Sequence, residues 1–184
     1  MRYIILFTGI VIAALAAAAQ ARGETGGMAR ERAQGAAVEI INMRSSLAKE
    51  FVKPDTVITA ETFMKVCGAV GKRVKELSAG GLEVRHAAVK YRNPANAATQ
   101  EEAELIKRFE REDGLESVNK EFEREGKPYY SVTQPIYVER ACLSCHGGKD
   151  ARPEFIVNKY PQDRAWGFNE GDLRGIITVT APID

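Results

Sequence analysis

The sequence has almost no net charge. Its 184 residues include 26 Lys and Arg against 25 Asp and Glu. A balanced chain creates no strong electrostatic field, so the composition gives no support for partners recognised mainly by their charge, such as nucleic acids or anionic membrane surfaces. Internal repeats and low-complexity tracts are also missing after residue 21, and 45% of the residues are apolar. We therefore expect one folded domain of ordinary size.

Cysteine and histidine are both scarce. The chain has three cysteines, and an odd number cannot be used up by a simple disulfide framework. At least one cysteine must therefore have another role. The three cysteines are Cys67, Cys142 and Cys145, and the two histidines are His86 and His146.

The first 21 residues predict an export signal. Arg2 is followed by an apolar run from Tyr3 to Ala19, and Ala19-Gln20-Ala21 is a small-residue cleavage pattern. We expect cleavage after Ala21 and a periplasmic mature protein. The alternative is an uncleaved membrane anchor, although a run of 17 residues is at the lower limit for spanning a bilayer. Removal of this segment takes away one charged residue, Arg2, which leaves 25 Lys and Arg against 25 Asp and Glu.

Apolar spacing predicts three helices, over residues 28–51, 60–77 and 99–111. In the second helix Cys67 shares one face with Phe63 and Val70, so we expect its side chain to point into the core. The predicted organisation is a signal peptide at 1–21, an N-terminal helix within 22–54 and the main domain over 55–184.

Three strands are predicted over residues 82–91, 129–138 and 175–181, where β-branched and aromatic residues gather. Pro135 places the second strand at an edge or a bulge. Residues 112–127 are interpreted as loop with marginal helix, and 142–166 as an irregular loop around a prosthetic group. Because the order lacks regular βαβ alternation, we expect an α+β fold with an antiparallel sheet.

The segment Cys142-Leu143-Ser144-Cys145-His146 contains the Cys-x-x-Cys-His signature of c-type haem attachment. Two thiols three residues apart lie on one side of a helical turn, where they can add to the two vinyl groups of one porphyrin. The imidazole of His146 then reaches the iron from below. The motif predicts one haem c, bound covalently through both cysteines, and makes the domain over 55–184 a haem domain.

Two other interpretations use the same residues. A dithiol redox pair also has Cys-x-x-Cys, but it usually follows a strand of a βαβ unit, which is not evident here. A zinc site could combine Cys67, Cys142, Cys145 and His146, although a second paired motif is lacking.

The residue types alone do not decide which side chain binds the iron opposite His146. Cys67 is the thiol that the attachment motif leaves over, and it ranks slightly above His86. Both residues also have an ordinary interpretation: Cys67 could be an inert buried cysteine, and His86 could be a hydrogen-bonded histidine in the core or on the surface. Met28, Met43 and Met64 are further donors.

From Phe63 to Gly175, about three fifths of the chain, a set of residues forms a more specific pattern. The set consists of Cys67, Arg92-Asn93-Pro94, Asn96, the segment from Cys142 to Gly147, Tyr160-Pro161, Asp163, Gly167, Gly171, Asp172 and Gly175. It resembles a family of bacterial single-haem c-type proteins with a PAS-like sensor fold. The resemblance implies His146 and Cys67 as the two axial ligands. The chain departs from the family at Ala97-Ala98-Thr99 and at His86.

The resemblance and the motif together favour a redox or diatomic-gas sensor over an enzyme. A thiolate ligand stabilises ferric iron, and displacement of a buried Cys67 on reduction would open a position for a gas. The alternative function is a low-potential electron carrier. Either function requires a redox or signalling partner protein. Arg92 is expected to pair with a haem propionate, and Lys90 and Lys159 are weaker candidates.

Overall fold

The computed structural model describes residues 4–183, with side chains described from residue 23 onwards. Its helices are α1 (Ile4–Phe51), α2 (Ala60–Phe63), α3 (Ala69–Ala79), α4 (Gln100–Arg111), α5 (Leu143–His146) and α6 (Glu154–Lys159). Its strands are β1 (Glu83–Ala87), β2 (Val118–Arg124), β3 (Lys127–Tyr137) and β4 (Leu173–Pro182). A π-helical turn, η1 (Met64–Gly68), joins α2 to α3, and 3-10 turns lie at Pro94–Asn96, Arg140–Cys142 and Lys149–Ala151.

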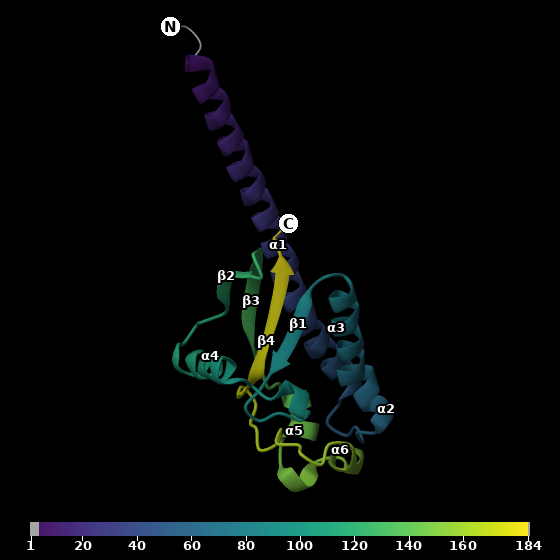
Figure 1. The fold of residues 1–184 in the computed structure, drawn as a ribbon. Helices are drawn as coiled ribbons and strands as arrows, with labels where there is room; N and C mark the ends of the chain where they lie inside the picture. The colour runs from purple at the N-terminus through teal and green to yellow at the C-terminus, as the bar shows by residue number, and fades with distance from the viewer. Residues whose placement is uncertain (1–3, 184) are drawn as a thin grey trace.

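The four strands form one antiparallel sheet in the order β1-β4-β3-β2. The last strand of the chain therefore lies in the middle of the sheet, between β1 and β3 (Figure 1). Helices and an antiparallel sheet confirm the predicted α+β class, and the arrangement is consistent with a PAS-like fold.

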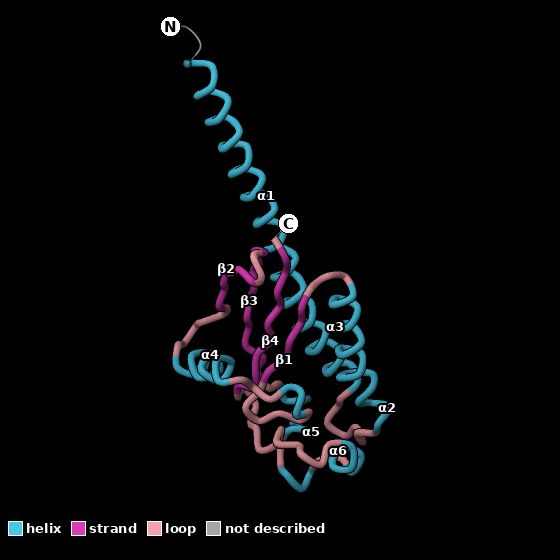
Figure 2. The backbone as a smooth tube through the Cα atoms, in the orientation of Figure 1, coloured by secondary structure: helices cyan, strands magenta, loops and turns pink. Residues whose placement is uncertain are grey.

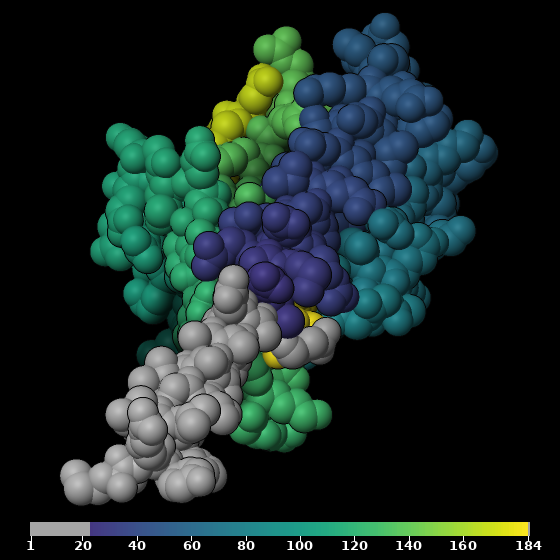
Figure 3. Space-filling view, turned by 90° about the horizontal axis from the view of Figure 1, so that it is seen from above, coloured from purple at the N-terminus to yellow at the C-terminus, as the bar shows by residue number. Residues whose placement is uncertain are grey.

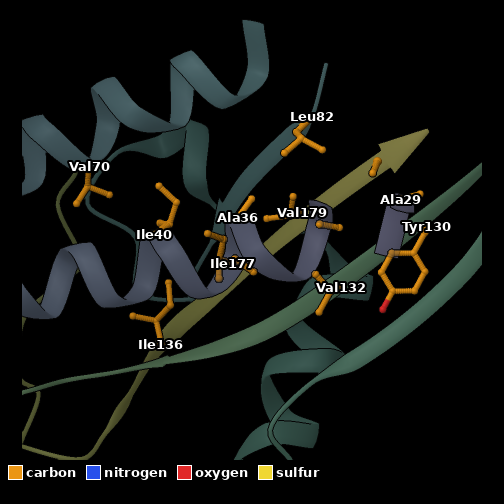
Figure 4. Packing of buried hydrophobic residues seen from close by; sticks show 13 residues of the cluster. Ala29, Ala36, Ile40, Val70, Leu82, Tyr130, Val132, Ile136, Ile177 and Val179 are labelled. Atoms are coloured by element: carbon orange, nitrogen blue, oxygen red, sulfur yellow. The ribbon is translucent and has the colours of Figure 1, made fainter. Parts of the chain in front are cut away.

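The main core lies between α1 and one face of the sheet. Small residues at helical spacing let the backbone of α1 approach β3 and β4 closely, and Ile40 fills the space beyond them (Figure 4). From the sheet, Val132 and its partner Val179 are fully buried against the helix. Complete burial of one such side chain contributes about 1.5–3 kcal/mol. The small residues are Ala29, Ala33, Ala36 and Ala37.

Helix α1 is much longer than the sequence predicts. It begins at Ile4 rather than near Met28, and its N-terminal part projects well beyond the sheet (Figures 1 and 2). Its described side chains adjoin the strands on one side and the α2–α3 region on the other (Figure 3). The side chains of the expected signal peptide, residues 1–21, lie outside the described part, so its cleavage stays a prediction. Within residues 23–183, where side chains are described, none of the helices combines the length and apolar character needed to cross a membrane.

Helix α4 covers part of the opposite face of the sheet. A capping box fixes its start, because the Thr99 side chain accepts from the Glu102 N–H and the Glu102 side chain accepts from the Thr99 N–H. Ile106 and Phe109 then pack on Ile176 of β4. The predicted helix over residues 99–111 is confirmed.

The prediction for residues 112–127 is wrong, because β2 occupies most of that segment. Its charged residues suggested a loop, yet the backbone of β2 pairs with β3 from Val118↔Thr133 to Arg124↔Lys127. An edge strand tolerates charged side chains on both faces, and charge there discourages further pairing. The β2 ladder ends at Thr133, so Pro135 has a strand partner only in β4, and a bulge follows at Ile136/Tyr137.

Two other boundaries differ from the predictions. Strand β1 ends at Ala87 instead of continuing to residue 91. The predicted loop over residues 142–166 contains the short helices α5 and α6 and a 3-10 turn.

Candidate functional site

A cavity of about 230 Å³ lies where α3, α5 and the ends of β1 and β4 meet. It brings together four of the six predicted site residues: Cys67, His86, Arg92 and His146. The other two, Cys142 and Cys145, belong to the short segment that carries His146 and do not line the cavity themselves. The remaining lining residues are Arg44, Phe63, Val70, Gly71, Ala87, Ala88, Asn93, Asn96, Ile136, Tyr160, Arg174, Gly175 and Ile176.

The expected burial of Cys67 in the core is wrong. Its side chain is exposed, and it faces the cavity instead of the apolar interior. Regular α-helical spacing fails here because Cys67 lies within the π-helical turn η1, which changes the phase between α2 and α3. Val66 and Val70 are the residues that reach the core. Such turns occur often at functional sites.

Gly71 leaves the surface of α3 without a side chain next to Cys67. It lies one helical turn after Cys67 and also lines the cavity. Of the described atoms, none lies within 4 Å of the position that a Gly71 Cβ would take. A side chain at residue 71 would therefore stand in the open space next to the Cys67 thiol.

The attachment motif forms a tight helical turn. A 3-10 turn (Arg140–Cys142) leads into α5, and Gly147 ends the helix. A Cβ on Gly147 would lie 2.7 Å from the carbonyl oxygen of Leu143, so a side chain there would displace the turn. Burial raises the pKa of Cys142, and it raises the pKa of Cys145 to about 11. Both thiols are therefore protonated near neutral pH.

His146 presents one ring nitrogen to the cavity. Its Nδ1–H donates to the carbonyl oxygen of Ala165 at 2.7 Å, which leaves the lone pair of Nε2 available. Burial, assisted by the positive charges of Arg174 and Arg92, holds the pKa of His146 well below 6.5. The neutral imidazole with an oriented second nitrogen is the form that binds a metal. The ring of Phe168 stands edge-on to it, with 6.1 Å between centroids.

Asp163 organises the surroundings of His146. Its fully buried carboxylate accepts from the Ala165 N–H at 2.9 Å and from Arg152 at 3.0 Å. It also lies 3.5 Å from Arg92, whose Nη2 donates to the carbonyl oxygen of Cys145 at 2.6 Å. The carboxylate thus holds both the peptide that orients the imidazole and the guanidinium that anchors the motif.

His86, the alternative ligand, is already engaged. Arg44 Nη2 donates to His86 Nε2 at 3.0 Å, so that nitrogen is an acceptor and the proton is on Nδ1. Burial and the charges of Arg44 and Arg174 lower the pKa of His86 to about 3. Cys67 has a free approach to the cavity, whereas His86 would first have to give up Arg44.

Of the residues expected near propionates, only Arg92 lines the cavity. Lys90 donates to the carbonyl oxygen of Gly167 and lies over the ring of Phe168, and Lys159 lies over Phe63. Arg44 and Arg174 are lining residues that sequence reasoning missed. A signal existed for Arg44, because it follows the core residue Ile40 by one helical turn and is thus a charge on an apolar stripe.

Across residues 4–183, no group of three or more His, Cys, Asp or Glu residues is placed to hold a metal ion. The four-ligand zinc interpretation therefore gains no support from the geometry.

Comparison with known proteins identifies the family of this chain. A family model described as Tll0287-like matches residues 22–182. The crystal structure of the cyanobacterial heme-protein Tll0287 is similar at 38% sequence identity and a TM-score of 0.69, and the match covers 80% of this chain and 91% of that one. None of the curated proteins matches the chain. Because the family model spans most of the sequence, the chain belongs to the Tll0287-like family.

Proposed function

We propose that this chain is an exported single-haem c-type protein that senses redox change or a diatomic gas. Cys142 and Cys145 would carry the haem through thioether bonds, and His146 and Cys67 would be the axial ligands. The proposal is supported by the Cys-x-x-Cys-His motif and by 38% identity to a protein described as a heme-protein.

The observation that carries the proposal is the pair of donors on the cavity. His146 Nε2 has its lone pair free because Nδ1 donates to Ala165, and Cys67 lines the same cavity from a different element. One imidazole and one thiol from opposite parts of the chain are a suitable axial pair for haem iron.

Other features of the cavity fit the same group. Its walls include the apolar residues Phe63, Val70 and Ile136, which suit a macrocycle, and the helix surface at Gly71 is bare. The Nε atoms of Arg44 and Arg92 are buried, and neither has a hydrogen-bond partner among the described residues. When bound, haem supplies an iron that changes oxidation state and accepts a diatomic gas.

The exposure of Cys67 supports a role as a sensor. The predicted burial of the sulfur is wrong, but an exposed thiolate can take up a proton from solvent when it leaves a metal, without transfer through the core. A ligand that is easily displaced suits a sensor that passes its state to a partner protein. The protein would act in the periplasm and would not be an enzyme.

The attachment is tested by a pyridine haemochrome assay on protein exported from a host with the haem maturation machinery. The expected result is a c-type spectrum that remains with the polypeptide after denaturation and extraction with acidified organic solvent. Pigment that enters the solvent, or a polypeptide without porphyrin mass, would show that the thioether bonds are absent.

The axial ligands are tested by Cys67→Ser with His86→Gln as the matched control on the same cavity. Cys67→Ser should abolish the thiolate signature of the ferric spectrum, whereas His86→Gln should keep it. The opposite pattern would transfer the ligand role to His86. Addition of CO to the reduced wild type then separates the functions, because binding of CO supports the sensor, and rapid electron exchange without CO binding supports the low-potential carrier.

A further inference from the structure

The wall of the cavity is strongly cationic. Arg44 from α1, Arg92 from the segment after β1 and Arg174 from β4 all line it, whereas no Asp or Glu among the described residues does. Both histidines on the wall are neutral at physiological pH, because their pKa values are lowered. The site therefore holds three positive charges with no negative charge on its surface.

Each guanidinium is held in place by a neutral acceptor. Arg44 donates to His86, Arg92 donates to the Cys145 carbonyl, and Arg174 Nη1 donates to the Lys90 carbonyl at 2.9 Å. A guanidinium has five N–H donors, so these bonds orient the fork and leave donors unused. The buried Nε atoms of Arg44 and Arg92 illustrate this, since neither has a hydrogen-bond partner in the described part of the chain.

The charges are only partly compensated inside the protein. Asp163 pairs with Arg92 at 3.5 Å, but it is shared with Arg152. Neither Arg44 nor Arg174 forms an ion pair within residues 23–183, and burial together with Arg44 and Arg92 lowers the pKa of Arg174 to about 10. Buried cations that repel one another are unfavourable unless an anion joins them.

We propose that Arg44 and Arg174, with Arg92 behind them, form a carboxylate-binding wall that holds the two propionate groups of the prosthetic group. This inference rests on the proposed haem function and adds the residues that recognise the acidic edge of the porphyrin. It extends the sequence prediction, which named Arg92 for this role and Lys90 and Lys159 as weaker candidates. Arg92 is largely engaged by Asp163 and Cys145, whereas Arg44 and Arg174 have the donors to form charge-assisted bonds.

The test compares iron protoporphyrin with its dimethyl ester, whose two carboxylates are neutral. Both are titrated into the full chain carrying Cys142→Ala and Cys145→Ala, which prevents thioether formation. We expect the free acid to bind at least about tenfold more tightly than the ester, the ratio for one hydrogen bond to a charged group. In the Arg44→Gln/Arg174→Gln variant that ratio should fall close to one.

Arg140→Gln is the matched control, because Arg140 lies beside the attachment motif but its side chain is 85% exposed and pairs with Glu170. It should keep the full preference for the free acid. Melting of the haem-free variants checks folding, and loss of two repelling charges should leave the melting temperature unchanged or raise it. If the double variant fails to fold, Arg44→Gln alone should still reduce the ratio severalfold.

The outcomes separate the two proposals. If the chain with Cys142→Ala and Cys145→Ala binds acid and ester equally, the carboxylate wall is refuted while haem binding stands. A preference that persists when Arg44→Gln/Arg174→Gln is added would also refute it. If neither porphyrin binds, the carboxylate wall is refuted, and the proposed function fails as well when the exported wild type gives no c-type haemochrome. A rise in melting temperature with inorganic phosphate, combined with equal porphyrin affinities, would mean that the arginines take a dissolved anion, and this too would overturn the inference.

Discussion

Substitution of Asp163 by Asn should destabilise the protein far more than an ordinary loss of charge. The carboxylate is fully buried and faces Arg92 at 3.5 Å and Arg152 at 3.0 Å. Asn has a similar shape and keeps an oxygen for the Ala165 N–H, so the change removes the negative charge and leaves two largely buried guanidinium groups without it. Removal of one partner from a buried ion pair typically costs about 3–5 kcal/mol.

We expect the free energy of unfolding of the haem-free chain to fall by about that amount, as measured by urea denaturation. This would be a large share of the total for a domain of this size, which is about 5–15 kcal/mol. The same substitution should loosen the Ala165 peptide that accepts from His146. Nitrogen NMR of the imidazole should then show a mixture of tautomers where the wild type has its proton on Nδ1.

Glu121→Gln is the matched control, because Glu121 pairs with Arg30 on the surface, with side chains 59% and 55% exposed. Exposed pairs contribute about 0–1 kcal/mol, so this variant should unfold almost like the wild type. If Asp163→Asn costs no more than Glu121→Gln, the buried carboxylate does not organise the site. A wild-type tautomer in the Asn variant would refute the link to His146 even if stability falls.

Two further predictions concern the cavity wall. Gly175→Ala should lower the free energy of unfolding, measured by urea denaturation, by at least about 1–3 kcal/mol. The reason is that φ at Gly175 is +154° and a Cβ there would lie 2.4 Å from the Ala87 carbonyl oxygen. An unchanged midpoint would show that β1 and β4 can separate at no cost. His86 has its pKa lowered from 6.5 to about 3 by burial and by Arg44 and Arg174, so the unfolded chain binds the extra proton as pH falls through that window. The titration of His86 should therefore lower stability towards acid by up to about 1.4 kcal/mol per pH unit, in addition to the effect of His146, and His86→Gln should remove this share of the slope between pH 6.5 and pH 4; an identical slope would place the histidine in contact with solvent.

The elements that the sequence predicts well are those with a strong local signal. Helix α4 has a capping box at Thr99 and an apolar stripe, and β4 has consecutive β-branched residues that suit a strand buried on both faces. Strand β2 has neither, since its seven residues are mostly charged and it becomes a strand only by pairing with β3. Pairing with the backbone of the next strand leaves no periodic signal in the charged side chains of β2.

The site shows the same division. The spacing of Cys142, Cys145 and His146 predicts haem attachment from the sequence alone, because it places all three on one helical turn. The orientation of Cys67 could not be predicted, since a π-helical turn changes the phase on which helical spacing depends. The roles of Arg44 and Arg174 depend on α1, β1 and β4 meeting at one end of the sheet, which no local pattern encodes.

The attachment turn obtains its position from residues that follow it by about twenty positions in the sequence. Helix α5 has only four residues and no side-chain N-cap, so local hydrogen bonding cannot define its direction. The segment from Asp163 to Phe168 supplies the missing restraints: the Ala165 carbonyl accepts from the imidazole, and the Phe168 N–H donates to the His146 carbonyl at 3.1 Å. Because the Asp163 carboxylate holds that segment and, through Arg92, the Cys145 carbonyl, one buried charge fixes the motif from both sides. The two thiols and the imidazole can thus be oriented before a cofactor arrives, and the charge that orients them lies outside the motif.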